Sequence, residues 1–331
     1  MQFDGTLLLS RSDVRQLLTL SESIGAIEKV FRLQGEGKIP ASGILGIKTR
    51  EGGLHVKVGF LPGERDFIVA KLNTNFPGNQ ARFGLPTIQG VILVSDAANG
   101  LPLAVLDSID ITIKRTAAAT AVAAKCLARN DSSVATICGC GEQGRAQLPA
   151  LLLMLPIKTV YAFDLNDETA ESFARDFSRE LKIGIDAVRA LPSAIRRSDV
   201  VVTCTTAKQL FVNKADVAPG TFIAAVGADD AHKQEIDPAL LARVKVVADS
   251  LEQCCAIGDT HHAITRGLMR KEDVYAELAE IVAGGKPGRT HDVDIIVFDS
   301  TGVAIEDAVV AAAVYEKARA SAVRTHFQFA A

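Results

Sequence analysis

The feature that most constrains the fold is an alternation of short apolar runs and helical stretches, which begins near residue 133. The runs lack any polar–apolar alternation, which is typical of strands buried on both faces. They are "SVATIC", "TVYAFD", "IGIDAV", "DVVVTC", "TFIAAVG", "VKVVAD" and "DIIVFDS". Stretches such as "EQGRAQLPALLLML" and "DETAESFARDFSREL" lie between them and favour helices. This order predicts a doubly wound α/β domain with a parallel sheet.

The first 110 residues have a different pattern. The strand-like stretches "DFIVAKLNT", "PTIQGVILVSDA" and "LPLAVLDS" are separated by the turn signals "PGER", "FPGNQ" and "AANG". This pattern predicts an antiparallel or mixed α+β domain. Residues 111–129 favour a helix that links the two domains, and "AIEDAVVAAAVYEKARA" predicts a long helix near the end of the chain.

Charge and cysteine usage narrow the class of partner. The net charge is −3 and the pI about 6.1, so no basic field points to nucleic acid. The longest apolar runs, such as "ALLLML", are too short for a membrane span, and "MQFDGTLLLSRSDVRQLL" lacks a signal-peptide pattern. The six cysteines have no metal-site spacing and are expected to be small, reduced residues rather than catalytic thiols. We therefore expect a cytoplasmic protein with no metal.

A glycine-rich loop follows the first of the buried strands. Gly139, Gly141 and Gly144 form G-x-G-x-x-G between "SVATIC" and a predicted helix. The motif is weak alone, but in this context it is typical of a dinucleotide site. The first glycine allows the tight turn, the second a close approach of pyrophosphate, and the third close packing of the helix. The N–H groups at the start of that helix attract phosphate.

Asp164 ends the second strand of this domain, 25 residues after Gly139. A carboxylate there accepts hydrogen bonds from ribose hydroxyls and repels a 2′-phosphate. Leu165 and Asn166 supply no compensating cation. The sequence favours NAD over NADP, although Asp164 as an ordinary strand-end acid is the alternative.

Side chains beyond the carboxyl ends of the strands are candidates for the chemistry, because ligands of open α/β sheets lie there. These side chains are Thr205, Thr206, Asp229, Asp230 and Asp299. An acid in this position could act as general acid or base, and the residues alone do not rank the three acids.

Several cations are candidate anchors for a substrate. Lys71 interrupts the apolar run "FIVAKLNTNF", where a buried cation needs a partner such as a substrate carboxylate. The alternative is an edge-strand lysine that reaches water. Lys57, Lys114 and Arg115 are further candidates. The neighbouring His261 and His262 have no third ligand at metal spacing and favour a solvated helix face.

Four stretches, together with the glycine loop, resemble the ornithine cyclodeaminase/mu-crystallin family over nearly the whole chain. They are "AKLNTNFPGN" (70–79), "KRTAAATAVAAKCLAR" (114–129), "VGADDAHKQEI" (226–236) and "FDSTGVAIEDAVVAAAVYEKA" (298–318). The resemblance implies a homodimer. It also implies a substrate-binding and dimerisation domain of residues 1–113 with the helix 304–331, and a Rossmann-type dinucleotide-binding domain of residues 114–303.

The resemblance also implies roles for particular residues. Lys71 matches the family's substrate-pocket lysine, Arg115 the arginine that grips the substrate carboxylate, and Asp229 the catalytic acid/base. Asp229 and Lys71 are the residues expected to be catalytic, and Lys71 is also expected to bind substrate. Residues expected at the cofactor are Gly139, Gly141, Gln143, Gly144, Asp164, Thr116, Thr205 and Val226.

Two departures from the family pattern concern the substrate pocket. An arginine common near "KIPASGILG" is replaced by Ala41 and Ser42, so one carboxylate contact is either missing or supplied by Lys57. The glutamate that holds ornithine's distal ammonium aligns near His55, Val56 or Lys57. A cation there repels a second ammonium by about 4 kcal/mol at 4 Å and an effective dielectric of 20, which counts against ornithine.

Three enzyme activities fit this reading, all with hydride exchange at the α-carbon of an amino acid or cyclic imine. They are reduction of an imine such as Δ1-pyrroline-2-carboxylate, oxidative deamination as in an alanine dehydrogenase, and cyclodeamination of ornithine to proline. A non-enzymatic binding protein of the mu-crystallin kind is the alternative. The presence of Lys71, Arg115 and Asp229 favours an enzyme.

Overall fold

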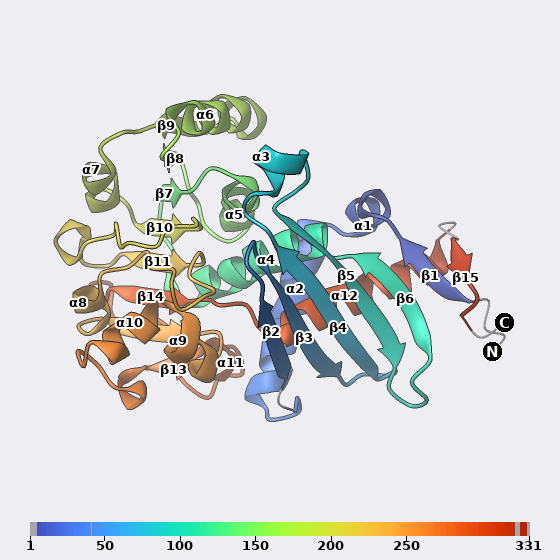
Figure 1. Cartoon of the computed structure of the whole chain (residues 1–331). Helices are drawn as coiled ribbons and strands as arrows, with labels where there is room; N and C mark the ends of the chain where they lie inside the picture. Colours follow the sequence, from blue (N-terminus) through green and yellow to red (C-terminus); the bar gives the residue numbers. More distant parts are fainter. Residues whose placement is uncertain (1–4, 41, 322–324, 330–331) are drawn as a thin grey trace. The chain divides into compact units, whose positions relative to one another are not determined.

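The structure is a computed structural model that describes residues 5–40, 42–321 and 325–329. The chain forms two compact units, shown in Figure 1. Unit 1 contains residues 1–115 and 303–331, and unit 2 contains residues 116–302. The division falls within one helix, α4 (Ile109–Leu127).

Unit 1 is built on a mixed seven-stranded sheet with the order β15-β1-β6-β5-β4-β3-β2. Only β1 and β6 pair in parallel among its described strands. The strands are β1 (Thr6–Leu9), β2 (Gly43–Lys48), β3 (Gly53–Leu61), β4 (Phe67–Asn75), β5 (Ile88–Asp96), β6 (Pro102–Asp107) and β15 (His326–Phe327). The expected mixed α+β architecture is confirmed.

The helices of unit 1 are α1 (Arg11–Leu17), α2 (Leu20–Gly35), α3 (Asn79–Phe83), the start of α4 and α12 (Ala304–Ala320). The helix α12 packs on β3, β4 and α2, and twelve of its residues are buried. It is apolar on nearly all sides because the sheet and α2 both cover it. It starts against Gly59 of β3, where an added Cβ would lie 3.5 Å from the Ala304 carbonyl group.

The pleat of this sheet separates two adjacent rows of side chains. Leu45, Val56, Leu72 and Val91 are cross-strand neighbours in β2, β3, β4 and β5. The next row, on the opposite face, contains Ile44, Lys57, Lys71 and Ile92. Because side chains alternate between faces along a strand, the first row belongs to the outer face, and Lys57, Lys71 and Ile92 of the second row lie on the face that α12 covers. Ile92 and Lys71 are buried, whereas Leu45 and Val91 are exposed.

Unit 2 contains a parallel eight-stranded sheet with the order β13-β12-β14-β11-β10-β7-β8-β9. Its strands are β7 (Val134–Cys138), β8 (Thr159–Phe163), β9 (Gly184–Ala187), β10 (Val200–Thr203), β11 (Phe222–Ala225), β12 (Lys245–Ala248), β13 (Ala276–Glu277) and β14 (Ile296–Asp299). The order reverses at β7, which lies between β8 and β10. This is the doubly wound, Rossmann-type arrangement predicted from the sequence.

The helices of unit 2 connect these strands. They are α5 (Glu142–Leu152), α6 (Asp167–Leu181), α7 (Leu191–Arg196), α8 (Pro238–Leu241), α9 (Leu251–Ile257), α10 (Asp259–Thr265) and α11 (Leu278–Val282), with short 3-10 turns at Lys214–Asp216 and Lys271–Asp273. In α6, Asn166 caps the first turn, and Ala170, Phe173 and Phe177 form the buried face. All seven predicted strands of this unit are present, and β13 is an additional one of two residues.

Candidate functional site

The glycine loop of unit 2 lies at the reversal point of its sheet, between the carboxyl ends of β7 and β10. Gly139 has φ +97°, and an added Cβ would lie 2.8 Å from the Cys204 carbonyl oxygen. A Cβ on Gly144 would lie 2.0 Å from the Gly139 carbonyl oxygen. These two glycines are required by the turn and by close packing of α5, as the motif predicts.

Gly141 has a different role, because nothing lies within 4 Å of the place where its Cβ would be. It is the N-cap of α5 and makes no side-chain cap. The start of α5 therefore has open space beside Gly141, and a helix start without a side-chain cap suits a bound phosphate. Gln143 lies in this first turn and is half-buried.

Asp164 lies directly beside the loop. Its carboxylate accepts a hydrogen bond of 2.9 Å from the Cys140 N–H and one of 3.0 Å from the Asn166 N–H. The following residue, Leu165, is 97% exposed. Asp164 is placed to accept hydrogen bonds from a ribose with a free 2′-hydroxyl. The uncharged, exposed Leu165 adds no cation for a 2′-phosphate and could pack against the ring of a bound nucleotide.

A buried glutamate, Glu235, organises the loops that follow β10 and β11. It accepts hydrogen bonds from the Thr203 hydroxyl (2.7 Å), the Thr205 N–H (2.7 Å), the Thr205 hydroxyl (2.6 Å) and the Gly227 N–H (2.9 Å). Burial raises its pKa, although these hydrogen bonds oppose the shift. The sequence analysis assigns Glu235 no role. Its place in the family-like stretch 226–236 is the sequence feature that points to it.

Of the three candidate acids, Asp299 is a structural residue. It is fully buried at the end of β14 and accepts hydrogen bonds from the N–H groups of Asp259 and Thr260. Burial raises its pKa to about 7. An acid without access to solvent or ligand cannot exchange protons with a substrate, so the hypothesis that placed Asp299 beside the other two acids is wrong.

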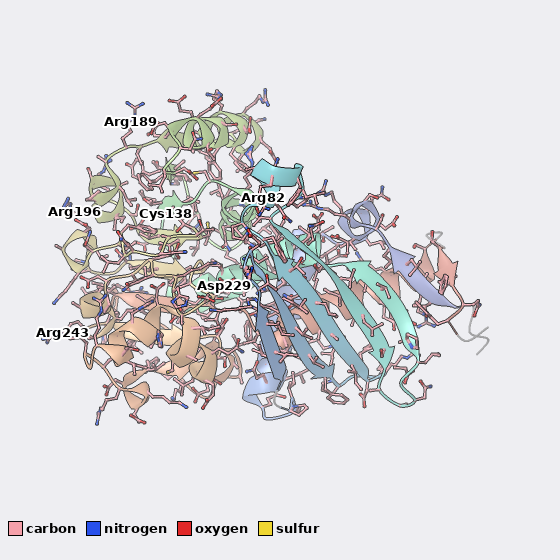
Figure 2. All side chains as sticks on the ribbon, viewed as in Figure 1. Arg82, Cys138, Arg189, Arg196, Asp229 and Arg243 are labelled. Atoms are coloured by element: carbon pink, nitrogen blue, oxygen red, sulfur yellow. The ribbon has the colours of Figure 1, made fainter. Side chains whose placement is uncertain are left out.

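Asp229 is in the opposite situation. It lies in the loop after β11 and is labelled in Figure 2. Its side chain is 55% exposed and forms a 2.5 Å ion pair with Lys233. The Asp230 carboxylate accepts a hydrogen bond from the His232 N–H and is half-buried. Asp229 therefore has the accessibility that proton exchange with a ligand needs.

The remaining predicted cofactor residues also belong to unit 2. Thr116 is 7% exposed on α4. Thr205 is half-buried and held by Glu235, and the Val226 N–H donates to the Thr203 carbonyl oxygen. Thr205 and Val226 follow β10 and β11, so they lie at the same edge of the sheet as the glycine loop.

The cations that the sequence singles out meet on the inner face of unit 1. The Lys71 ammonium lies 2.6 Å from one Asp307 oxygen, and the Arg115 Nε lies 3.0 Å from the other. Arg115 Nη1 also forms a 2.6 Å ion pair with Glu306. Lys71 is 4% exposed on an interior strand, so the alternative of an edge-strand lysine that reaches water is wrong. The chain itself supplies the partner that a buried lysine needs.

Burial lowers the pKa of the Lys71 ammonium to about 7, although Asp307 acts to raise it. Repulsion from Arg115 and Lys57 contributes to the lowering. Lys57 is the cross-strand partner of Lys71 and is half-buried on the same face. Ala41 lies outside the described residues, and Ser42 is exposed.

Two other predictions change with the structure. His261 and His262 are half-buried rather than solvated, and their rings lie within hydrogen-bond distance of the Cys255 and Lys233 carbonyl oxygens. Lys114 donates to the Leu18 carbonyl oxygen, just beyond α1, at 2.5 Å and is a structural residue.

The six cysteines are free, and burial raises the pKa of the thiols of Cys138, Cys140 and Cys204 near the glycine loop. Among the described residues, no group of three or more His, Cys, Asp or Glu side chains could hold a metal ion. No helix in the described part of the chain is long and apolar enough to cross a membrane.

The fold and the site define a protein with a Rossmann-type unit and a second α+β unit that carries a buried cluster of ion pairs. The model of the ornithine cyclodeaminase/mu-crystallin family matches residues 5–322, and the chain belongs to that family.

Comparisons with known proteins give similar relatives over the full length. Alanine dehydrogenase of Archaeoglobus fulgidus is 37% identical over 324 residues, 98% of each chain. The structure of an archaeal alanine dehydrogenase dimer with bound NAD has a TM-score of 0.94 and 37% identity over 98% of this chain and 99% of that chain. Δ1-pyrroline-2-carboxylate reductase of Thermococcus litoralis, in complex with NADH and L-proline, has a TM-score of 0.90 and 35% identity over 95% and 98%.

Proposed function

We propose that the protein is an NAD-dependent oxidoreductase of amino-acid metabolism that exchanges a hydride at the α-carbon of an amino acid or imino acid. The observation that carries the proposal is the convergence of Lys71 and Arg115, from separate elements, on one buried carboxylate. Two relatives of similar fold bind NAD, or NADH with an amino acid, which supports the same class of chemistry.

The cofactor residues proposed are those of the glycine loop with Gln143, Asp164, Thr116, Thr205 and Val226. The open space at Gly141 and the uncapped start of α5 fit a pyrophosphate. Asp164 fits the ribose of NAD better than the 2′-phosphate of NADP, because no cation is adjacent in the sequence. When bound, the nicotinamide supplies or accepts the hydride.

The substrate's carboxylate is proposed to bind Arg115 and Lys71, with Lys57 as a further contact. Asp307 and Glu306 hold the Arg115 guanidinium in one orientation, and a planar guanidinium of fixed orientation suits recognition of a carboxylate. Asp229 is proposed to move the proton at the substrate nitrogen or to activate water.

Between the activities that fit, the arrangement favours reduction of an imine, or its reverse, over cyclodeamination. Cross-strand partners have Cβ atoms about 5 Å apart, so Lys57 and Lys71 are close. A substrate with a distal ammonium would bring a fourth cation to this face, beside Lys57, Lys71 and Arg115. Ornithine cyclodeamination and an alanine dehydrogenase activity are the alternatives, and a mu-crystallin-like binding protein is the non-enzymatic one.

A direct assay separates these activities. The protein is mixed with NADH or NADPH and Δ1-pyrroline-2-carboxylate, and separately with NAD and ornithine or alanine, while nicotinamide absorbance and ammonia are followed. Consumption of NADH by the imine supports the proposal. Ammonia from ornithine without net change of the cofactor would establish cyclodeamination instead. No change in nicotinamide absorbance or ammonia with any substrate would overturn the proposed function. Full turnover by Asp229→Asn would overturn the proposed role of Asp229.

We also propose a homodimer that forms through the outer face of the sheet of unit 1. Leu45, Ile47, Ile68, Leu72 and Val91 on this face are each 36–58% exposed, and such a contiguous apolar surface is typical of an interface. The relative with bound NAD is itself described as a dimer. Leu72→Lys should give a monomer in sedimentation velocity, whereas Leu268→Lys, at an exposed leucine of unit 2, should not. A Leu72→Lys protein that sediments as wild type would refute this interface.

A cytoplasmic location is part of the proposal. The six free cysteines, several of them buried, fit a reducing compartment. Fractionation of the native cells tests the location, and recovery from a secreted fraction would contradict it.

A further inference from the structure

The first turn of α12 carries two adjacent acids, Glu306 and Asp307, that both face into unit 1. One Asp307 oxygen contacts Lys71 of β4, and the other contacts Arg115 of α4. A single carboxylate therefore joins the two cations proposed to bind substrate, although they come from different elements. Glu306 forms an ion pair with Arg115, whereas Asp307 forms ion pairs with both cations, so Asp307 couples them.

All four side chains are buried, with exposed fractions of 5% for Lys71, 7% for Arg115, 0% for Glu306 and 1% for Asp307. Water does not screen charges at this depth, so the charge of each group depends strongly on its neighbours. Removing one partner of a buried ion pair leaves the other charge uncompensated.

Every element around Lys71 contributes to this balance. The charged groups are Asp307 and Glu306 from α12, Arg115 from α4 and Lys57 from β3, while the neighbour from β5 is the apolar Ile92. Burial and the two other cations lower the pKa of Lys71, and Asp307 is the neighbour that raises it. The charges of Lys71 and Arg115 in turn hold the pKa of Asp307 below its ordinary value, against the effect of burial.

We propose that Asp307 is a positioning residue that orients Lys71 and Arg115 together and stabilises the ammonium form of Lys71. This inference deepens the proposed function and rests on it for the roles of the two cations. Without the Asp307 carboxylate, Lys71 would lie among Arg115, Lys57, Glu306 and apolar side chains, and its ammonium form would be less stable. The site would then more readily lose one of the charges proposed to attract a substrate carboxylate.

The test measures the proton on Lys71 directly. Protein with lysines labelled by 13C and 15N is titrated by NMR, and Lys71→Met identifies the Lys71 signal. In the wild type, Lys71 should titrate near pH 7. In Asp307→Asn its midpoint should move down by about one pH unit or more, because an opposite charge nearby has been removed. Asp307→Glu, which keeps the charge, should recover most of that shift.

Asp96→Asn is the matched control. Asp96 is another largely buried acid of unit 1, paired with Arg65 rather than with the cluster. Its loss should leave the Lys71 midpoint unchanged. An equal midpoint in wild type and Asp307→Asn would overturn the inference. If Asp307→Asn is unfolded by circular dichroism, Asp307→Ser takes its place and is judged by the same criterion.

This readout separates failure of the inference from failure of the proposed function. A wild type without turnover refutes the proposed function, whereas the NMR titration still decides the role of Asp307. If the wild type turns over substrate, the limb of the pH profile of kcat/KM that reports Lys71 should shift in Asp307→Asn in the same direction as the NMR midpoint. A merely structural role for Asp307 would lower stability but leave that limb in place.

Discussion

Asp299 gives unit 2 a pH dependence that can be worked out from its environment. The carboxyl group is fully buried, and burial raises its pKa from 3.8 to about 7. The folded protein therefore holds a proton that the unfolded chain releases between these two pH values. By linkage, this group lowers the free energy of unfolding as the pH rises from about 4 to about 7. The full effect is present above pH 7.

The size of the effect follows from the shift of about three pKa units. At about 1.4 kcal/mol per unit, the cost is about 4 kcal/mol above pH 7, of which about 3 kcal/mol develops between pH 5 and pH 8. Asp299→Asn cannot ionise and does not have this cost. The free energy of unfolding of the variant, relative to wild type, should therefore rise by about 3 kcal/mol over that range.

Urea unfolding at pH 5, 6, 7 and 8 tests this expectation. Circular dichroism is the suitable signal, because the chain contains no tryptophan. Asp237→Asn is the control, since it removes one charge from unit 2 and preserves the N-cap of α8. Parallel pH curves for wild type and Asp299→Asn would refute the reasoning. They would show that Asp299 is ionised throughout or that relaxation offsets its burial.

Three further predictions concern the cofactor site of unit 2. Gly141→Ala should leave the melting temperature within about 2 °C of wild type, because nothing crowds the new Cβ. It should weaken NADH binding in calorimetry by about tenfold or more, because the methyl group enters the space proposed for the pyrophosphate. An unchanged affinity would contradict a pyrophosphate at that position. Glu235→Ala should lower the free energy of unfolding by about 3 kcal/mol in urea titrations, because four donor groups of Thr203, Thr205 and Gly227 lose a buried acceptor. A loss below about 1 kcal/mol would mean that water replaces the carboxylate. Asp164→Ser should raise the KM for NADH and lower that for NADPH in steady-state kinetics, and an unaltered ratio would remove Asp164 from the ribose site.

Elements that depend on local signals could be predicted from the sequence. The strands of unit 2 are runs of apolar residues between helices, and the glycine loop has a recognisable spacing, so the doubly wound fold followed from neighbouring residues. The family resemblance added the long-range organisation and the candidate roles of Lys71, Arg115 and Asp229.

The contacts that complete the site could not be predicted in the same way. Asp307 meets Lys71 only because α12 returns to the sheet after the whole of unit 2. Glu235 reaches Thr203, Thr205 and Gly227 across two loops, and no periodic pattern marks such an acceptor. Asp229 and Asp299 both follow apolar strands, and only their burial distinguishes an accessible acid from a structural one.

The division of unit 1 between the two ends of the chain also affects the order in which the protein is made. Strands β1 to β6 of its sheet are made before unit 2, and α12 and β15 come after it. Until then the inner face of the sheet lacks its main covering helix, and Lys71 lacks its acid partner. Unit 2 is contiguous in the chain and has its complete set of residues earlier. The substrate-side unit is therefore the last to be completed, and the nascent chain carries an uncovered apolar sheet face for most of its synthesis.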